Sequence, residues 1–141
     1  MTYQDHANAV LGLLAAAPGG PPLVVLDGYV PTGTTAPYVV VYFAFDAPAP
    51  ETDPGSSDGL QRSNRLDAWA YCHCVGATEM AARAVAARVR SALLDVSPAV
   101  TSRSVWPIRH VENQPATRDE STGPLVVDLV DVYRLSSVPA T

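Results

Sequence analysis

The sequence predicts an α+β fold: a mostly antiparallel sheet of about five strands with two helices packed on it, in the order α-β-β-β-α-β-β. Three stretches carry this prediction. Residues 66–75 alternate small and bulky side chains with the period of a strand. Residues 78–96 carry an apolar stripe with the period of a helix, and residues 38–45 are almost entirely β-branched or aromatic. The length of 141 residues favours one domain over residues 1–141.

The N-terminal part of the chain predicts one helix followed by two strands. Residues 2–14 carry a helical apolar stripe, which comprises Tyr3, Ala7, Val10, Leu11 and Leu14. The proline- and glycine-rich run at residues 18–22 ends this helix. Residues 23–30 predict a strand that is interrupted at Asp27 and Gly28, and residues 38–45 predict the strongest strand of the chain.

The strand at residues 66–75 has two different faces. One face is small and apolar: Leu66, Ala68, Ala70, Cys72 and Cys74. The following helix presents a matching stripe, made of Ala81, Val85, Val89, Ala92 and Val96, so we expect the helix to dock on the small face. The bulky face, with Trp69, Tyr71 and His73, then needs another cover. For Trp69, burial within one subunit and burial between subunits are equally compatible with the sequence.

The remaining segments predict two long loops and two strands. Residues 46–64 and 113–123 are polar and without periodicity, and long unstructured connections of this kind are usually functional or disordered. Residues 101–112 predict a strand in which Pro107 requires an edge or a bulge. Residues 125–135 predict the last strand, and we expect residues 136–141 to fray.

No motif in the sequence points to catalysis or to a cofactor. On a strand, the thiols of Cys72 and Cys74 face one side and the imidazole of His73 faces the other, so one metal ion cannot bind all three. We expect both cysteines to be reduced and buried. Neither a phosphate-binding loop nor a nucleophile elbow occurs. The sequence therefore predicts a protein that is not an enzyme, with no catalytic, cofactor-binding or metal-binding residues and no cofactors.

Composition limits the partners. The net charge is −5, and all nine basic residues are arginine, so duplex DNA is disfavoured as a specific ligand of the surface as a whole. No run reaches the roughly 20 apolar residues of a membrane span, and the N-terminus lacks the basic start of a signal peptide. We therefore expect a soluble protein made inside the cell, with no membrane partner.

The order of these elements resembles the tail terminator proteins of long-tailed bacteriophages. The resemblance covers most of the chain and is carried by the short first helix, the Val-rich strand pair, the long polar loop, the Ala/Val/Arg helix within residues 77–93 and the closing strand at residues 126–134. It implies an α+β virion protein that assembles as a hexameric ring at the head-proximal end of the tail, after synthesis in the host cytoplasm. The implied partners are other copies of the chain, the tail tube protein and a neck or stopper protein. DNA would pass through the lumen without specific binding.

Two groups of residues are candidates for these contacts. The candidate subunit interface comprises Trp69, Tyr71, His73 and Tyr42. The candidate lumen or docking residues are charged and lie in or beside the two long loops: Asp46, Glu51, Asp53, Asp58, Arg118, Asp119 and Glu120. Some of the acidic residues at positions 51–58 would then face the lumen. Two alternatives remain open: a head-tail connector or tail-completion protein, and a small ligand-binding or enzymatic α+β domain with its site between the first long loop and the Trp69 face.

Overall fold

The computed structural model describes residues 2–46, 65–121 and 123–140. Within these ranges it contains two helices and seven strands, which confirms the predicted α+β class. In chain order the elements are α1 (Thr2–Ala15), β1 (Val25–Asp27), β2 (Tyr38–Asp46), β3 (Leu66–Gly76), α2 (Glu79–Leu93), β4 (Arg103–Val105), β5 (Arg109–Asn113), β6 (Thr117–Asp119) and β7 (Val126–Pro139). No helix in the described ranges is long and apolar enough to cross a membrane.

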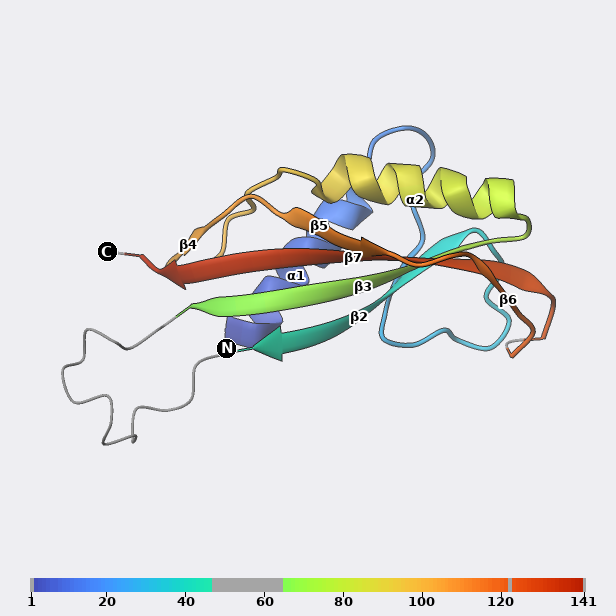
Figure 1. Cartoon of the computed structure of the whole chain (residues 1–141), viewed down its shortest axis with the longest axis horizontal. Helices are drawn as coiled ribbons and strands as arrows, with labels where there is room; N and C mark the ends of the chain where they lie inside the picture. Colours follow the sequence, from blue (N-terminus) through green and yellow to red (C-terminus); the bar gives the residue numbers. More distant parts are fainter. Residues whose placement is uncertain (1, 47–64, 122, 141) are drawn as a thin grey trace.

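One mixed sheet organises these strands (Figure 1). Its central order is β1-β2-β3-β7, and the free edge of β7 pairs with β6, β5 and β4 along its length. β1 joins β2 in parallel, whereas the other pairings are antiparallel, so the sheet is mixed and has more strands than the sequence predicted. The β1–β2 pair thus departs from the mostly antiparallel sheet that the sequence predicts: the connection over residues 28–37 returns the chain to the starting end of β1 before β2 begins.

The predicted docking of α2 on the small-residue face of β3 is confirmed, although the helix ends at Leu93, so Val96 of the predicted stripe lies beyond it, and Ala81 is only partly buried. Ala70, Cys72 and Cys74 of β3 are at most 2% exposed and share one core with Val85 and Val89 of α2. Their small volume lets the helix lie close to the sheet. At the turn into the helix the approach is closest: a Cβ added to Gly76 would lie 2.4 Å from the backbone nitrogen of Ala82. Figure 1 shows α2 along the upper side of the sheet, with α1 behind the strands.

The chain is ordered as far as Ala140. The prediction that residues 136–141 fray is therefore wrong for residues 136–140. β7 continues to Pro139 because it pairs with β3 as far as Ser137 and with β4 from Ser137 to Pro139, and Ser137 is completely buried. His6 of α1, which is also completely buried, lies 2.7 Å from the Ser137 hydroxyl. Arg103 of β4 donates from Nε to the same hydroxyl at 3.0 Å. These bonds join α1, β4 and β7 at one point in the interior.

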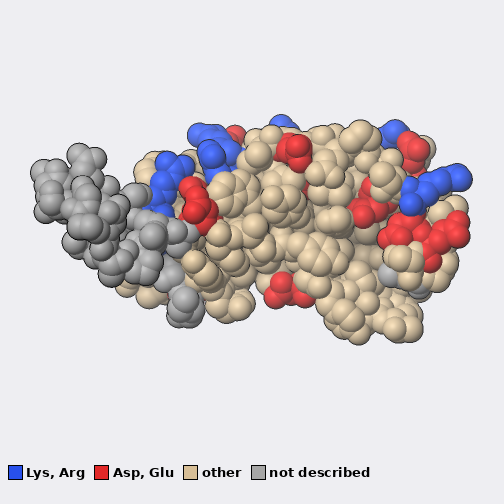
Figure 2. Space-filling view, turned by 60° about the horizontal axis from the view of Figure 1, so that its bottom comes forward, with Lys and Arg blue, Asp and Glu red and all other residues tan. Residues whose placement is uncertain are grey.

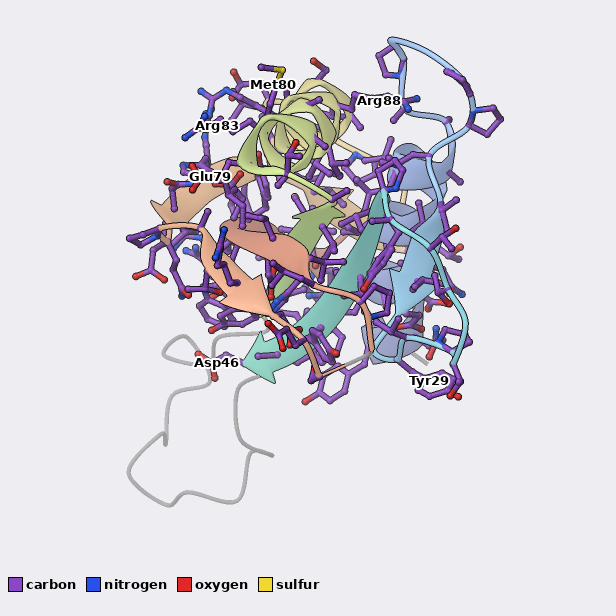
Figure 3. All side chains as sticks on the ribbon, turned by 90° about the vertical axis from the view of Figure 1, so that its right-hand side faces the viewer. Tyr29, Asp46, Glu79, Met80, Arg83 and Arg88 are labelled. Carbon is purple, nitrogen blue, oxygen red and sulfur yellow. The ribbon has the colours of Figure 1, made fainter. Side chains whose placement is uncertain are left out.

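A second polar link joins α2 to the turn that follows α1 (Figure 3). The Arg88 guanidinium donates to the carbonyl oxygens of Ala17, Pro18 and Pro21 at 3.2, 3.2 and 2.6 Å. A guanidinium has five donors in a fixed plane, so a single side chain can satisfy all three acceptors. This arginine therefore holds the proline- and glycine-rich turn against the helix.

Two further segments differ from prediction. The strand expected at residues 101–112 is divided into β4 and β5, because Pro107 cannot donate to a ladder and the chain leaves the sheet edge at residues 106–108. The predicted loop at residues 113–123 contains β6, which pairs with the start of β7. Of the predicted loop at residues 46–64, Asp46 ends β2, and residues 47–64 lie outside the described ranges.

Candidate interaction surface

The sheet has a second face, which neither described helix covers. Along β2, β3 and β7 the side chains of this face alternate with those of the helix-covered core. Tyr42 lies opposite Tyr71, and Trp69 lies opposite Arg134. The strand register thus brings the four predicted interface residues, Tyr42, Trp69, Tyr71 and His73, onto one face. We call this the helix-free face.

One end of the helix-free face is covered by the chain itself. Tyr38, Val40 and Val75 are each 3% exposed and pack against Leu26 and the segment that connects β1 to β2. Away from this cover, Tyr42 is 41% exposed, and Trp69, Tyr71 and His73 are partly exposed. The alternative of core burial within one subunit is therefore not realised for Trp69. Partly exposed aromatic side chains gathered on one sheet face are typical of contacts between proteins.

His73 is held in place on this face. Its Nδ1 is hydrogen-bonded to the Asp128 carboxylate at 2.8 Å, and its ring meets the Tyr42 ring edge-on at 5.1 Å between centroids. On the opposite face, Cys72 and Cys74 are free thiols and completely buried. Burial raises the pKa of the Cys72 thiol to about 12 and also raises the pKa of Cys74, because the thiolate would lose its hydration. Both side chains therefore pack as small apolar groups.

The other polar clusters lie largely inside the fold. The His6 and Ser137 pair is inaccessible, since both residues are 0% exposed. Asp131, 7% exposed, accepts hydrogen bonds from His110 at 2.9 Å and from Asn113 at 2.8 Å. These contacts fix β5 to β7. In residues 2–46, 65–121 and 123–140, no group of three His, Cys, Asp or Glu residues is arranged to hold a metal ion.

Three arginines gather at one end of the helix-free face. The three are Arg65, Arg109 and Arg134. Together with Trp106, Pro107 and Ser136 they line an open cavity of about 330 Å³. The Arg65 guanidinium lies 5.4 Å from the centre of the Trp106 ring and pairs with Asp67 at 3.1 Å, and Arg109 pairs with Asp95. We call this the arginine cavity. Sequence reasoning missed it because its arginines belong to segments that only the strand pairing brings together.

The predicted docking residues lie at two opposite ends of the sheet. Asp46 lies directly opposite Asp67, at the end that carries the arginine cavity. At the other end, Arg118 and Glu120 are exposed. Hydrogen bonding to the Ser121 side chain lowers the pKa of the Asp119 carboxyl, and the Ser121 backbone N–H, which donates to the same carboxylate at 2.8 Å, lowers it further. Figure 2 shows basic and acidic side chains together near both ends of the molecule, with the larger group of acidic ones at the end away from the grey segment. The remaining predicted residues, Glu51, Asp53 and Asp58, lie outside the described ranges.

Comparison with known proteins finds a likeness of fold. No family model matches the chain, and no curated protein sequence matches it. Among solved structures, the chain is similar to a chain from the virion of a native gene transfer agent particle, with 19% sequence identity and a TM-score of 0.54. The likeness covers 96% of this chain and 91% of that chain. The two chains therefore share a fold over almost their full lengths.

Proposed function

We propose that this chain is a structural protein of a phage-like virion, and more narrowly a tail terminator. In this role, copies of the chain form a ring, hexameric in the implied family, that caps the tail tube at its head-proximal end and joins it to the neck. The observation that carries the proposal is the likeness of fold, over almost the full length, to a chain of a gene transfer agent virion. The element order of the sequence, which resembles the tail terminators, supports the same role.

The helix-free face supplies a surface that such an assembly can bury. Tyr42, Trp69 and Tyr71 lie side by side on it and are only partly covered by the chain itself. A fully buried aromatic side chain removes about 150–250 Å² from water, and aromatic residues are enriched at the centres of protein interfaces. We assign this face to the contact with a neighbouring copy.

The proposal includes no catalytic step. The His6–Ser137 pair is enclosed, His73 is bound to Asp128, and Asp131 has two hydrogen-bond donors within the fold. These arrangements account for His6, His73 and Asp131 through structural contacts. They support a binding role for the helix-free face over the enzymatic alternative.

Native mass measurement and capping of tail tubes test the proposal. Wild-type protein should form a ring, visible by negative-stain microscopy, or should form it on the ends of purified tubes from the same virion. Trp69→Ser should weaken ring formation and capping, because it removes the largest side chain from the interface. Met80→Ser is the matched control, since Met80 is 80% exposed on α2, away from the helix-free face.

Two results would change the assignment. Protein that leaves tube ends uncapped and binds tailless filled heads identifies the head-tail connector alternative. Protein that binds neither tubes nor heads, and stays monomeric in both mixtures, refutes the virion role. Thermal unfolding of each variant separates loss of an interface from loss of the fold.

A further inference from the structure

We infer that the arginine cavity receives the Glu120 carboxylate of a neighbouring copy of this chain. The inference rests on the proposed ring and names one contact that closes it. Each copy would then place the end of its sheet that carries Glu120, called the acidic end below, in the arginine cavity of the next copy. This contact is head-to-tail, which is the arrangement that generates rings when the rotation between copies closes.

The electrostatics of the cavity call for one additional anion. Arg65 and Arg109 already pair with Asp67 and Asp95. The side chain of Arg134, only partly exposed, has no hydrogen bond or ion pair to any residue in the described ranges. A partly desolvated guanidinium is stabilised by a carboxylate, which can accept two parallel hydrogen bonds from it. Of the three arginines that line the cavity, Arg134 is thus the one with no carboxylate partner among the described residues.

A single carboxylate suits this cavity better than a nucleic acid does. The carboxylates of Asp67 and Asp95 lie beside the arginines. They would repel a chain of phosphates, as would the overall charge of −5. Trp106, 47% exposed, adds an apolar wall that an incoming protein side chain can contact. The chemistry thus favours an acidic side chain with apolar neighbours.

The opposite end of the molecule carries such a side chain. Glu120 follows β6 directly, is exposed, and its carboxylate makes no hydrogen bond to the described residues. Leu125, 42% exposed, lies close by in sequence at the start of β7, where Asp119 pairs with Val126. Along β7, the acidic end lies beside residue 127 and the arginine cavity beside residue 135. At the rise of a strand, these two positions are roughly 26 Å apart. Within one rigid sheet the two ends cannot meet, so the contact joins two copies.

Charge reversal at each end gives a specific test. Arg134→Glu alone would place two carboxylates at the contact, and Glu120→Arg alone would place two guanidinium groups there. Each single variant should associate at least about tenfold more weakly than wild type, as judged by native mass over a concentration series. An equimolar mixture of the two variants should recover assembly, because an alternating ring contains only opposite charges. Arg83→Glu is the control for a charge reversal elsewhere on the surface, since its side chain is 66% exposed on α2 and belongs neither to the arginine cavity nor to β6.

The outcomes separate this contact from the proposed function. If wild type forms rings and each single variant forms them equally well, the contact is overturned and the proposed ring is retained. For protein that is monomeric alone, Arg134→Cys mixed with Glu120→Cys gives a second measurement, because the natural thiols are buried. A disulfide-linked heterodimer formed only in the mixture supports the contact. No cross-link at high protein concentration overturns it, while tube capping by the wild type is judged separately.

Discussion

Gly76 is the position where the fold tolerates a side chain least. It ends β3 immediately before α2, and an added Cβ would lie 2.4 Å from the Ala82 nitrogen, 2.6 Å from the Ala81 carbonyl carbon and 2.7 Å from the Ala81 Cβ. Ordinary contact begins at 3.4 Å, so the first turn of α2 would have to move by 3.4 − 2.4 = 1.0 Å. The obstacle is mostly backbone, which cannot rotate away as a flexible side chain could.

That movement would also disturb the start of α2. The Thr78 hydroxyl accepts a hydrogen bond from the Ala81 N–H at 3.1 Å, and the Thr78 carbonyl accepts one from the Ala82 N–H at 3.0 Å. Overpacking costs about 1–3 kcal/mol, and loss of an N-cap costs about 1 kcal/mol. We therefore expect Gly76→Ala to lower the free energy of unfolding by roughly 2–4 kcal/mol.

Urea unfolding of matched variants measures this effect. Gly12→Ala is the control, because Gly12 lies within α1, is exposed, and an added Cβ there meets nothing within 4 Å. That variant should raise the free energy of unfolding by about 0.5–1 kcal/mol, since alanine favours the helix. The same chemical change should thus have opposite signs at the two positions. A Gly76→Ala protein within about 0.5 kcal/mol of wild type at equal m-value would refute the close-approach argument.

Three further predictions concern α2, the buried thiols and the helix-free face. Arg88→Met should lower the free energy of unfolding, measured in urea, by about 1–3 kcal/mol, because three carbonyl acceptors lose their donor. The control is Arg83→Met, which removes one exposed i,i+4 ion pair. Since the Arg83 side chain is 66% exposed, this variant should change the free energy of unfolding by less than about 0.5 kcal/mol. Because folding raises the pKa of Cys72 from 9 to about 12, the neutral thiol contributes fully to the free energy of unfolding below pH 9. This contribution is lost as pH rises toward 12, at about 1 kcal/mol per pH unit. The free energy of unfolding of Cys72→Ala should therefore fall less steeply with alkaline pH than that of wild type, and an unchanged slope would contradict this. Trp106→Phe leaves Trp69 as the sole tryptophan, and its fluorescence should shift to shorter wavelength when the protein assembles; an emission maximum that stays constant across assembly would place Trp69 outside the contact.

Local pattern was sufficient to predict the layer structure of this protein. The alternation of small and bulky side chains along β3, followed by the apolar stripe of α2, predicted which face the helix covers. The same alternation placed Trp69, Tyr71 and His73 together on the other face, because successive strand residues always point to opposite sides. These features depend on the period of the backbone and on neighbours close in sequence, so they can be read from residues 66–93 alone.

Tertiary structure decided everything that depends on pairing between distant segments. β1 lies parallel to β2, and β7 extends to Pro139. Both features depend on which strands lie next to each other in the folded sheet, and local propensity does not determine this. The arginine cavity likewise combines Arg65, which directly precedes β3, with Arg109 of β5 and Arg134 of β7, and these positions are far apart along the chain. Side chains at the ends of strands gain their neighbours only when register is set. The residues on the helix-free face are thus determined by sequence, whereas the opposing charged ends of the sheet are a property of the folded chain.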